Sequence, residues 1–360
     1  MIIGVVSDTH RDKAKALPQV MHEFKKRQVS LIVHCGDLYP EHFNSESFLG
    51  LPVICALIPE QESNPAFNVC HPNWVVTKTK DRIRDHQGTR MYVGHKRSHE
   101  FLKGTETEMA QMLAEARRDY DDLRWYFSGH THHQIFLEIP TVKFINPGAI
   151  EEGFDGFEYA VVDTDISQIV FSRILPVKPL INTFSVGIIS DSLNISMMDP
   201  NFWKLLVKEL QSRGVKDVIH CGNIALSDIG HDELRDFMVY YNLRPDQQNP
   251  KNVPKNWRQI PLDSPVVEIN GYQFYVQLDL GIDLLGKSEV GMSMLSLEKR
   301  RKFPEISYVL CGFTNNALYV ENKDVRIINP GDANKDRNFA VVCLPRAEIT
   351  FGHVPIETCF

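Results

Sequence analysis

Short, wholly apolar runs alternate with longer amphipathic stretches along the first half of the chain. Residues 2–6 and 30–34 form two such runs, and residues 14–27 between them have the spacing of a helix. Apolar runs that alternate with helices are typical of a sheet covered on both faces. The pattern therefore predicts the α/β class, with a mixed-sheet core flanked by helices.

Further elements are expected toward the middle of the chain. Residues 105–123 predict a helix, because their Thr- and Glu-rich start can serve as an N-cap. Three strands joined by tight turns are expected at 134–139, 142–146 and 158–164. Each sheet is thus predicted to begin with β/α units and to end in a meander.

The sequence also contains an internal repeat. Three segments of the first half recur in the same order in the second half, and the longest pair shares eight of twenty residues at a constant offset of 183. This predicts two tandem copies of one fold, at residues 1–177 and 183–360. The matching pairs are 2–10 with 185–193, 31–37 with 217–223, and 129–148 with 312–331.

Composition narrows the class of protein further. Hydrophobic residues make up 43% and charged residues 24%, which is typical of a globular protein and excludes a disordered or fibrous one. A net charge of −7 argues against a general nucleic-acid coat, although a nucleic-acid substrate stays open. No apolar run approaches the roughly 18 residues of a membrane span. The seven cysteines form no CxxC pair, which favours a reducing cytoplasm as the location.

Aspartate and histidine recur where the predicted strands of the first copy end. In an open α/β sheet, the loops beyond the carboxyl ends of the strands form the ligand crevice, so these side chains should converge. Mixed imidazole and carboxylate ligands suit Mn, Fe, Zn or Ni better than Ca or Mg. We therefore expect a metal centre. The six candidate ligands are Asp8, His10, Asp37, His95, His130 and His132.

The motifs that carry these residues resemble those of the calcineurin-like metallophosphoesterases, in particular the small phosphodiesterase branch. They read SDTH, GD, GH, GHTH and INPGA, and together they extend over the whole first copy. The resemblance implies two divalent ions and hydrolysis of a phosphoester. It implies that Asp8, His10 and His132 hold one ion and that Asp37 bridges. It also implies that His95 and His130 hold the second ion, with Asp37, His95 and His130 closest to the chemistry.

One segment departs from the family pattern. The family has a GN motif after the third strand, and its Asn binds the second metal and the phosphate. Residues 53–63 of this chain read VICALIPEQES and contain no GN. Glu60, Glu62 or Asn64 could take the place of the missing ligand, or the second ion could be weakly bound. The sequence leaves these alternatives open.

The second copy keeps the structural residues of the repeat and loses most of the chemistry. Of the six ligand types only one remains, Asp191 in place of Asp8. Leu and Phe cannot ligate a metal, and Asn in place of the bridging Asp removes a charge. We expect a degenerate domain that acts as a scaffold or binds a protein partner. The other replacements are Leu193 for His10, Asn223 for Asp37, Phe313 for His130, Asn315 for His132 and a residue near Leu278 for His95.

An extra polar segment of the second copy, residues 240–265, is a candidate partner-binding loop. It contains Tyr240, Tyr241 and Trp257, which are aromatic anchors of the kind that interfaces use. A loop folded onto its own domain is the other interpretation.

The sequence as a whole favours a metal-dependent phosphodiesterase with an inactive second copy. Two alternatives remain open. One is a non-catalytic scaffold of the same fold, and the other is a nuclease subunit of a larger complex. The oligomeric state also stays open.

Overall fold

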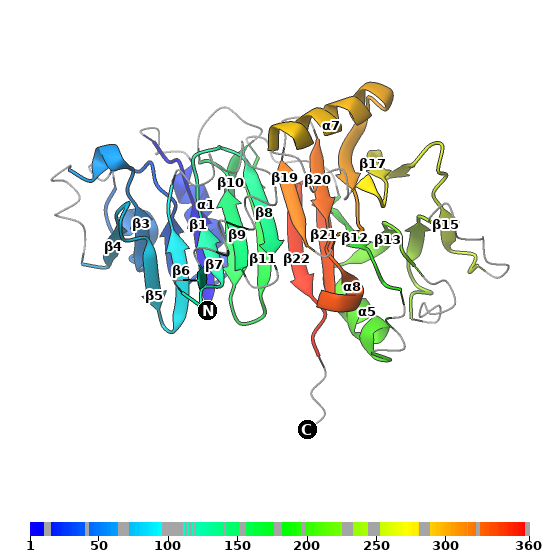
Figure 1. Ribbon diagram of the computed structural model, residues 1–360, viewed down its shortest axis with the longest axis horizontal. Helices are drawn as coiled ribbons and strands as arrows, with labels where there is room; N and C mark the ends of the chain where they lie inside the picture. Colours follow the sequence, from blue (N-terminus) through cyan, green and yellow to red (C-terminus); the bar gives the residue numbers. More distant parts are fainter. Residues whose placement is uncertain are drawn as a thin grey trace. The chain divides into compact units, whose positions relative to one another are not determined.

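The computed structural model divides the chain into two compact units with a mixed α/β fold (Figure 1). Unit 1 comprises Met1–Pro179 with Ser288–Val290, and unit 2 comprises Leu180–Lys287 with Gly291–Phe360. The residues that the structure describes are 1–10, 16–39, 43–63, 72–95, 111, 114, 117–118, 120–139, 142–150, 156–175, 182–193, 195, 199–224, 233–243, 253–280, 289–314, 316–321 and 325–356.

Unit 1 contains two mixed sheets. In the first, of order β11-β10-β1-β2-β3-β4, strands β1 to β4 are parallel and β10 and β11 are antiparallel additions. In the second, the order is β8-β9-β7-β6-β5. The first sheet consists of β1 (Ile2–Val6), β2 (Leu31–His34), β3 (Val53–Ala56), β4 (Trp74–Thr77), β10 (Phe157–Asp163) and β11 (Gln168–Ile174). The second consists of β5 (Ile83–His86), β6 (Thr89–Val93), β7 (Trp125–Phe127), β8 (Gln134–Ile139) and β9 (Val142–Pro147).

Helix α1 (Leu17–Lys26) closes one face of the first sheet of unit 1 (Figure 1). Its apolar side chains recur at helical spacing, and Val20 and Phe24 are fully buried among side chains of β1 and β2. A Cβ on Gly4 would lie only 2.4 Å from the Phe24 ring, so the ring packs directly on the backbone of β1. The unit also has two short 3₁₀ helices, η2 (Glu46–Phe48) and η3 (Pro59–Gln61).

Unit 2 has the same strand order and the same strand directions in both of its sheets. The first has the order β22-β21-β12-β13-β14-β15, and the second has the order β19-β20-β18-β17-β16. The strands are β12 (Phe184–Ile189), β13 (Val215–His220), β14 (Met238–Tyr241), β15 (Trp257–Gln259), β16 (Val266–Ile269), β17 (Tyr272–Val276), β18 (Ile306–Leu310), β19 (Leu318–Glu321), β20 (Arg326–Asn329), β21 (Asn338–Leu344) and β22 (Glu348–His353). The helices are α5 (Phe202–Ser212), α7 (Glu289–Lys302) and α8 (Ala333–Asp336).

The strands expected from the sequence are present, with some shifts at their ends. The predicted strand at 134–139 coincides with β8, and the predicted helix at 14–27 starts later, as α1. Strand β11 was not expected from the sequence pattern. Most of the predicted helix at 105–123 lies outside the described residues. Within the described part of the chain, no helix is both long and apolar enough to cross a membrane.

For Tyr241 and Trp257, the structure contradicts the interpretation of residues 240–265 as a partner-binding loop with aromatic anchors. Tyr241 ends β14 and Trp257 begins β15, and both side chains are buried in the core cluster of unit 2. Their ring centroids lie 5.8 Å apart. Two of the three aromatic residues therefore hold adjacent strands together and present no anchor to a partner. Residues 244–252 of this segment lie outside the described residues.

Candidate metal centre

The loops after β1 and β2 hold three of the expected ligands in an unusual backbone conformation. Asp8, His10 and Asp37 have φ values of 52°, 41° and 54°, in the left-handed region that side chains other than glycine rarely adopt. Backbone hydrogen bonds continue the strand pairing into these loops, from Asp8 N to Gly36 O (3.0 Å) and from His10 N to Asp37 O (3.1 Å). Such strain persists where the surroundings determine it, and it is typical of functional sites.

The loops after β6 and β7 bring in the three remaining histidines. His95 follows β6 and is buried, whereas His130 and His132 follow β7 with φ values of 80° and 59°. The Nδ1 atom of His95 lies 2.9 Å from the Cys35 carbonyl oxygen, so Nδ1 carries the proton. The Nε2 atom then faces the carboxylate of Asp8, which is the orientation of a metal-ligating histidine.

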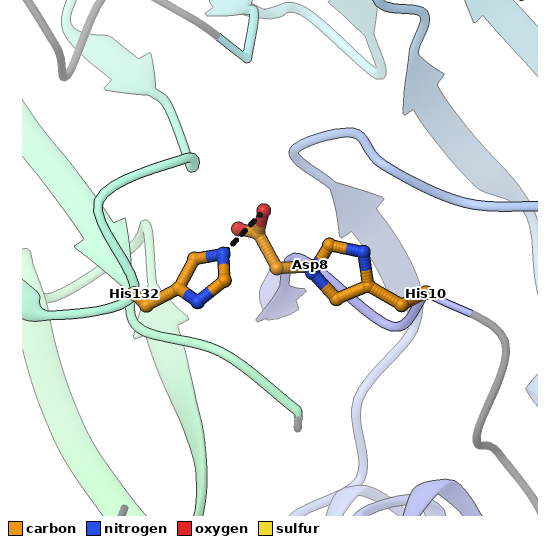
Figure 2. Close-up of side chains that lie close together, drawn as sticks. All are labelled: Asp8, His10 and His132. Atoms are coloured by element: carbon orange, nitrogen blue, oxygen red, sulfur yellow. Dashed lines mark ion pairs between the residues drawn. The ribbon is translucent and has the colours of Figure 1, made fainter. Parts of the chain in front are cut away.

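Five of the six expected ligands form two groups with the spacing that a metal ion requires. Asp8, His10 and His132 form one group, and Asp8, Asp37 and His95 form the other. In Figure 2 the Asp8 carboxylate lies between the imidazole of His132 and the loop that carries His10. The residue common to both groups is Asp8, and Asp37, which the family resemblance implies as the bridging ligand, belongs to the second group.

His130 belongs to neither group of the described residues. Its ring centroid lies 5.0 Å from that of His95, and its backbone N–H donates to Oδ2 of Asp8 at 3.0 Å. His130 is therefore beside the centre, and its main chain donates to the carboxylate of Asp8.

The carboxylate of Asp8 is ionised and only half satisfied. Burial raises the pKa of Asp8, but the nearby imidazoles of His132 and His95 and the hydroxyl of Ser7 lower it, to about 2. The Oδ1 atom lies 3.4 Å from Nε2 of His132 and 3.8 Å from Nε2 of His95. Among the described residues, this buried oxygen receives no hydrogen bond of good geometry. A buried negative oxygen facing two imidazoles fits a divalent transition metal.

The loop that replaces the family's GN motif is tied to both of its neighbours. The side-chain amide of Gln61, which is buried, donates to the Leu38 carbonyl oxygen at 2.9 Å, next to Asp37. The carboxylate of Glu62 accepts hydrogen bonds from the backbone N–H and the hydroxyl of Thr79. Neither Glu60 nor Glu62 joins a ligand group of the described residues, and Asn64 lies outside them. The sequence alone does not predict this contact of Gln61, because a single glutamine belongs to no recognisable motif.

The corresponding loops of unit 2 keep the backbone geometry without the ligands. Asp191, Asn223 and Phe313 have φ values of 56°, 57° and 68°, close to those of Asp8, Asp37 and His130. The Asn223 amide donates to Oδ1 of Asp191 at 2.9 Å, so an N–H group occupies the side of the carboxylate that faces imidazoles in unit 1. Leu278 packs against Gly222 as His95 packs against Gly36. Asn315 lies outside the described residues.

A buried histidine supports the second-strand loop in each unit. In unit 2, His220 accepts from Gly222 N–H at 3.2 Å and lies 2.8 Å from the Ser192 hydroxyl. In unit 1, His34 accepts from Gly36 N–H and lies beside Thr9 in the same way. Burial lowers the pKa of each histidine to about 3. These two residues are structural and are not ligands.

We expect His220 to make unit 2 sensitive to acid. The folded chain keeps His220 neutral, whereas the unfolded chain takes up a proton below pH 6.5, so stability is full above pH 6.5 and falls as the pH is lowered toward 3. At pH 5 the loss from this residue is about 2 kcal/mol. Denaturant unfolding of the wild type and of His220→Asn at pH 7.5 and pH 5 measures it. An unchanged pH slope in the variant would contradict the assignment.

Comparison with known proteins identifies the class of the first unit. Residues 1–167 match the family model of the calcineurin-like phosphoesterase superfamily domain. This part of the chain therefore belongs to the calcineurin-like phosphoesterase superfamily.

Similar proteins of known sequence or structure cover about half of the chain. A probable metallophosphoesterase of Methanothermobacter thermautotrophicus is 27% identical over 150 residues, which are 41% of this chain and 77% of the relative. Among solved structures, an archaeal phosphodiesterase matches with 18% identity, over 48% of this chain and 100% of its own, at a TM-score of 0.38. A Vps29 mutant from Entamoeba histolytica matches with 17% identity, over 49% of this chain and 94% of its own, at a TM-score of 0.34.

Proposed function

We propose that the protein is a metal-dependent phosphodiesterase whose catalytic centre lies in unit 1. The observation that carries this proposal is the pair of ligand groups that share Asp8, at the carboxyl ends of β1, β2, β6 and β7. The superfamily of unit 1 supports it, because calcineurin-like phosphoesterases use divalent metals.

The residues divide into two sets, one for each of two divalent transition-metal ions (Mn, Fe, Zn or Ni). Asp8, His10 and His132 hold one ion. Asp37 lies between the sets, with its Oδ2 atom 3.3 Å from Nδ1 of His10, and it belongs to the same group as His95. We assign Asp37 as the bridging ligand and His95 and His130 to the second ion. When bound, the ions neutralise the phosphate oxygens and activate a water for attack on phosphorus.

The chain itself supplies negative charge and fixes the orientation of the ligands. The carboxylates of Asp8 and Asp37 place two negative charges where two dications would otherwise repel. The Cys35 carbonyl oxygen fixes the His95 ring with its Nε2 atom toward the centre. The His130 imidazole lies beside His95 at the edge of the site, where it would hold the second ion, and a water molecule would protonate the leaving oxygen.

We propose that unit 2 is a non-catalytic copy of the same fold that serves as a scaffold or binds a protein partner. Two observations support this role: the strand order of unit 2 matches that of unit 1, and the Asn223 amide donates a hydrogen bond to the carboxylate of Asp191. Phe313 also favours a binding role, because its side chain is 47% exposed at the position that matches His130.

A matched pair of substitutions tests both proposals. In the wild type we expect one or two transition-metal ions per chain and turnover of bis-p-nitrophenyl phosphate with Mn²⁺. Asp8→Asn should lose both metal and turnover, because it removes the charge common to the two groups. Asp191→Asn should keep both, because Asp191 already accepts a hydrogen bond from the Asn223 amide and holds no metal ion in this proposal. Elemental analysis and the hydrolysis assay measure these outcomes. Metal retained by Asp8→Asn, or lost from Asp191→Asn, would contradict the assignment.

A further inference from the structure

One oxygen of the Asp8 carboxylate, Oδ2, accepts two hydrogen bonds from the protein. The Ser7 hydroxyl donates to Oδ2 at 2.5 Å, and the backbone N–H of His130 donates to the same oxygen at 3.0 Å. Ser7 and Asp8 are both completely buried, so no solvent competes for these hydrogen bonds. The two donors come from opposite sides of the site, one from the loop after β1 and one from the loop after β7.

The other oxygen is thereby left for the metal groups. A carboxylate that could rotate would present either oxygen, or both, to an ion. With Oδ2 held by two donors, only Oδ1 faces His132 and His95. Gly129 packs directly against the Ser7 hydroxyl, because a Cβ at this position would lie 1.8 Å from the Ser7 oxygen.

We propose that Ser7 is a positioning residue, which holds Asp8 so that a single oxygen atom, Oδ1, faces the imidazoles of His132 and His95. This inference rests on the proposed function of unit 1. Ser7 touches neither group directly, and it acts through the carboxylate. Partners that orient a ligand in this way commonly contribute 10- to 100-fold to metal affinity.

Unit 2 contains the same arrangement without the metal groups. The Ser190 hydroxyl donates to Oδ2 of Asp191 at 2.6 Å, and the backbone N–H of Phe313 donates to it at 2.9 Å. Gly312 approaches the Ser190 hydroxyl as closely as Gly129 approaches that of Ser7. The structural contribution of the serine is therefore present in both units, whereas a contribution to metal binding can exist only in unit 1. Ser190 is thus a matched control for Ser7.

The experiment compares Ser7→Ala with Ser190→Ala in the full-length chain. Binding of Mn²⁺ alone is followed by electron paramagnetic resonance of the free ion, and thermal unfolding is measured without metal. We expect both variants to lower the unfolding temperature of the metal-free chain by similar amounts. Only Ser7→Ala should weaken Mn²⁺ binding, by about 10- to 100-fold.

A second pair of variants keeps the hydroxyl and displaces it. Gly129→Ala places a methyl group against the Ser7 oxygen, and Gly312→Ala does the same to Ser190. We expect loss of Mn²⁺ affinity in the first variant and unchanged affinity in the second. If the wild type and Ser7→Ala bind Mn²⁺ with affinities equal within about twofold, the positioning role of Ser7 is wrong, and the proposed function of unit 1 is unaffected. A wild-type chain that binds Mn²⁺ in unit 1 but cleaves no phosphodiester would contradict the proposed function and leave this inference standing.

Discussion

Asp37→Asn is expected to abolish phosphodiesterase activity while the chain stays folded. The substitution removes the negative charge between the two ligand sets, and it keeps the size of the side chain. Stabilisation of the transition state by metal ions amounts to several kcal/mol, so we expect turnover of bis-p-nitrophenyl phosphate to fall at least about 10³-fold. The assay is run at saturating Mn²⁺, so that weaker binding of one ion alone does not account for the loss.

Unit 2 shows why the fold should tolerate this change. Asn223 occupies the matching position with nearly the same backbone, at φ 57° against 54° for Asp37. Asparagine adopts the left-handed region more readily than most residues, so no strain is added. We expect the unfolding temperature of metal-free Asp37→Asn to match that of the wild type. Turnover that survives the substitution would show that the two-ion assignment is wrong.

The sequence was sufficient to place the strands that precede the candidate ligands and the loops that carry these ligands. Wholly apolar runs marked β1 and β2 because both faces of a covered sheet are buried, and the ligands follow directly where the chain turns polar. The paired motifs at 7–10 and 129–132 therefore predict three of the five residues that form the two ligand groups.

The sharing of ligands could not be predicted from the sequence. Which carboxylate faces both groups depends on side-chain rotation, and that rotation is set by contacts between distant loops. Asp8 receives a hydrogen bond from His130 N–H, which is 122 residues away in the chain. The same contact directs the His130 main chain toward Asp8 and leaves its imidazole outside both groups.

The correspondence between the two units was also only partly visible in the sequence. The segment around Leu278 shares only isolated residues with the segment around His95, such as Tyr275 with Tyr92 and Val276 with Val93, and the chain between the second strand and this segment differs in length. The match becomes clear from packing: a Cβ on Gly36 would touch His95, and a Cβ on Gly222 would touch Leu278. The same close approach of backbone to side chain thus occurs in both units, with a histidine in one and a leucine in the other.

Asn223→Asp, the reverse of the first substitution, is expected to destabilise unit 2. It replaces the hydrogen bond from the Asn223 amide to Asp191 Oδ1 by two carboxylates that face each other. Burial already raises the pKa of Asp191, and the nearby charge of Asp332 contributes in the same direction. A second carboxylate at this half-buried position, without a partner, costs about 3 kcal/mol at pH 7.

The pH dependence and the response to metal separate this effect from a general loss of packing. The pair takes up protons more readily in the folded chain than in the unfolded chain, so the destabilisation is complete above its raised pKa and is lost as the pH falls toward 4. Denaturant unfolding of the wild type and Asn223→Asp at pH 7 and pH 4.5 measures the difference. Saturating Mn²⁺ should not restore the stability, because Leu193, Leu278 and Phe313 supply no ligand atoms. Full recovery with Mn²⁺ at pH 7 would mean that unit 2 retains a metal site.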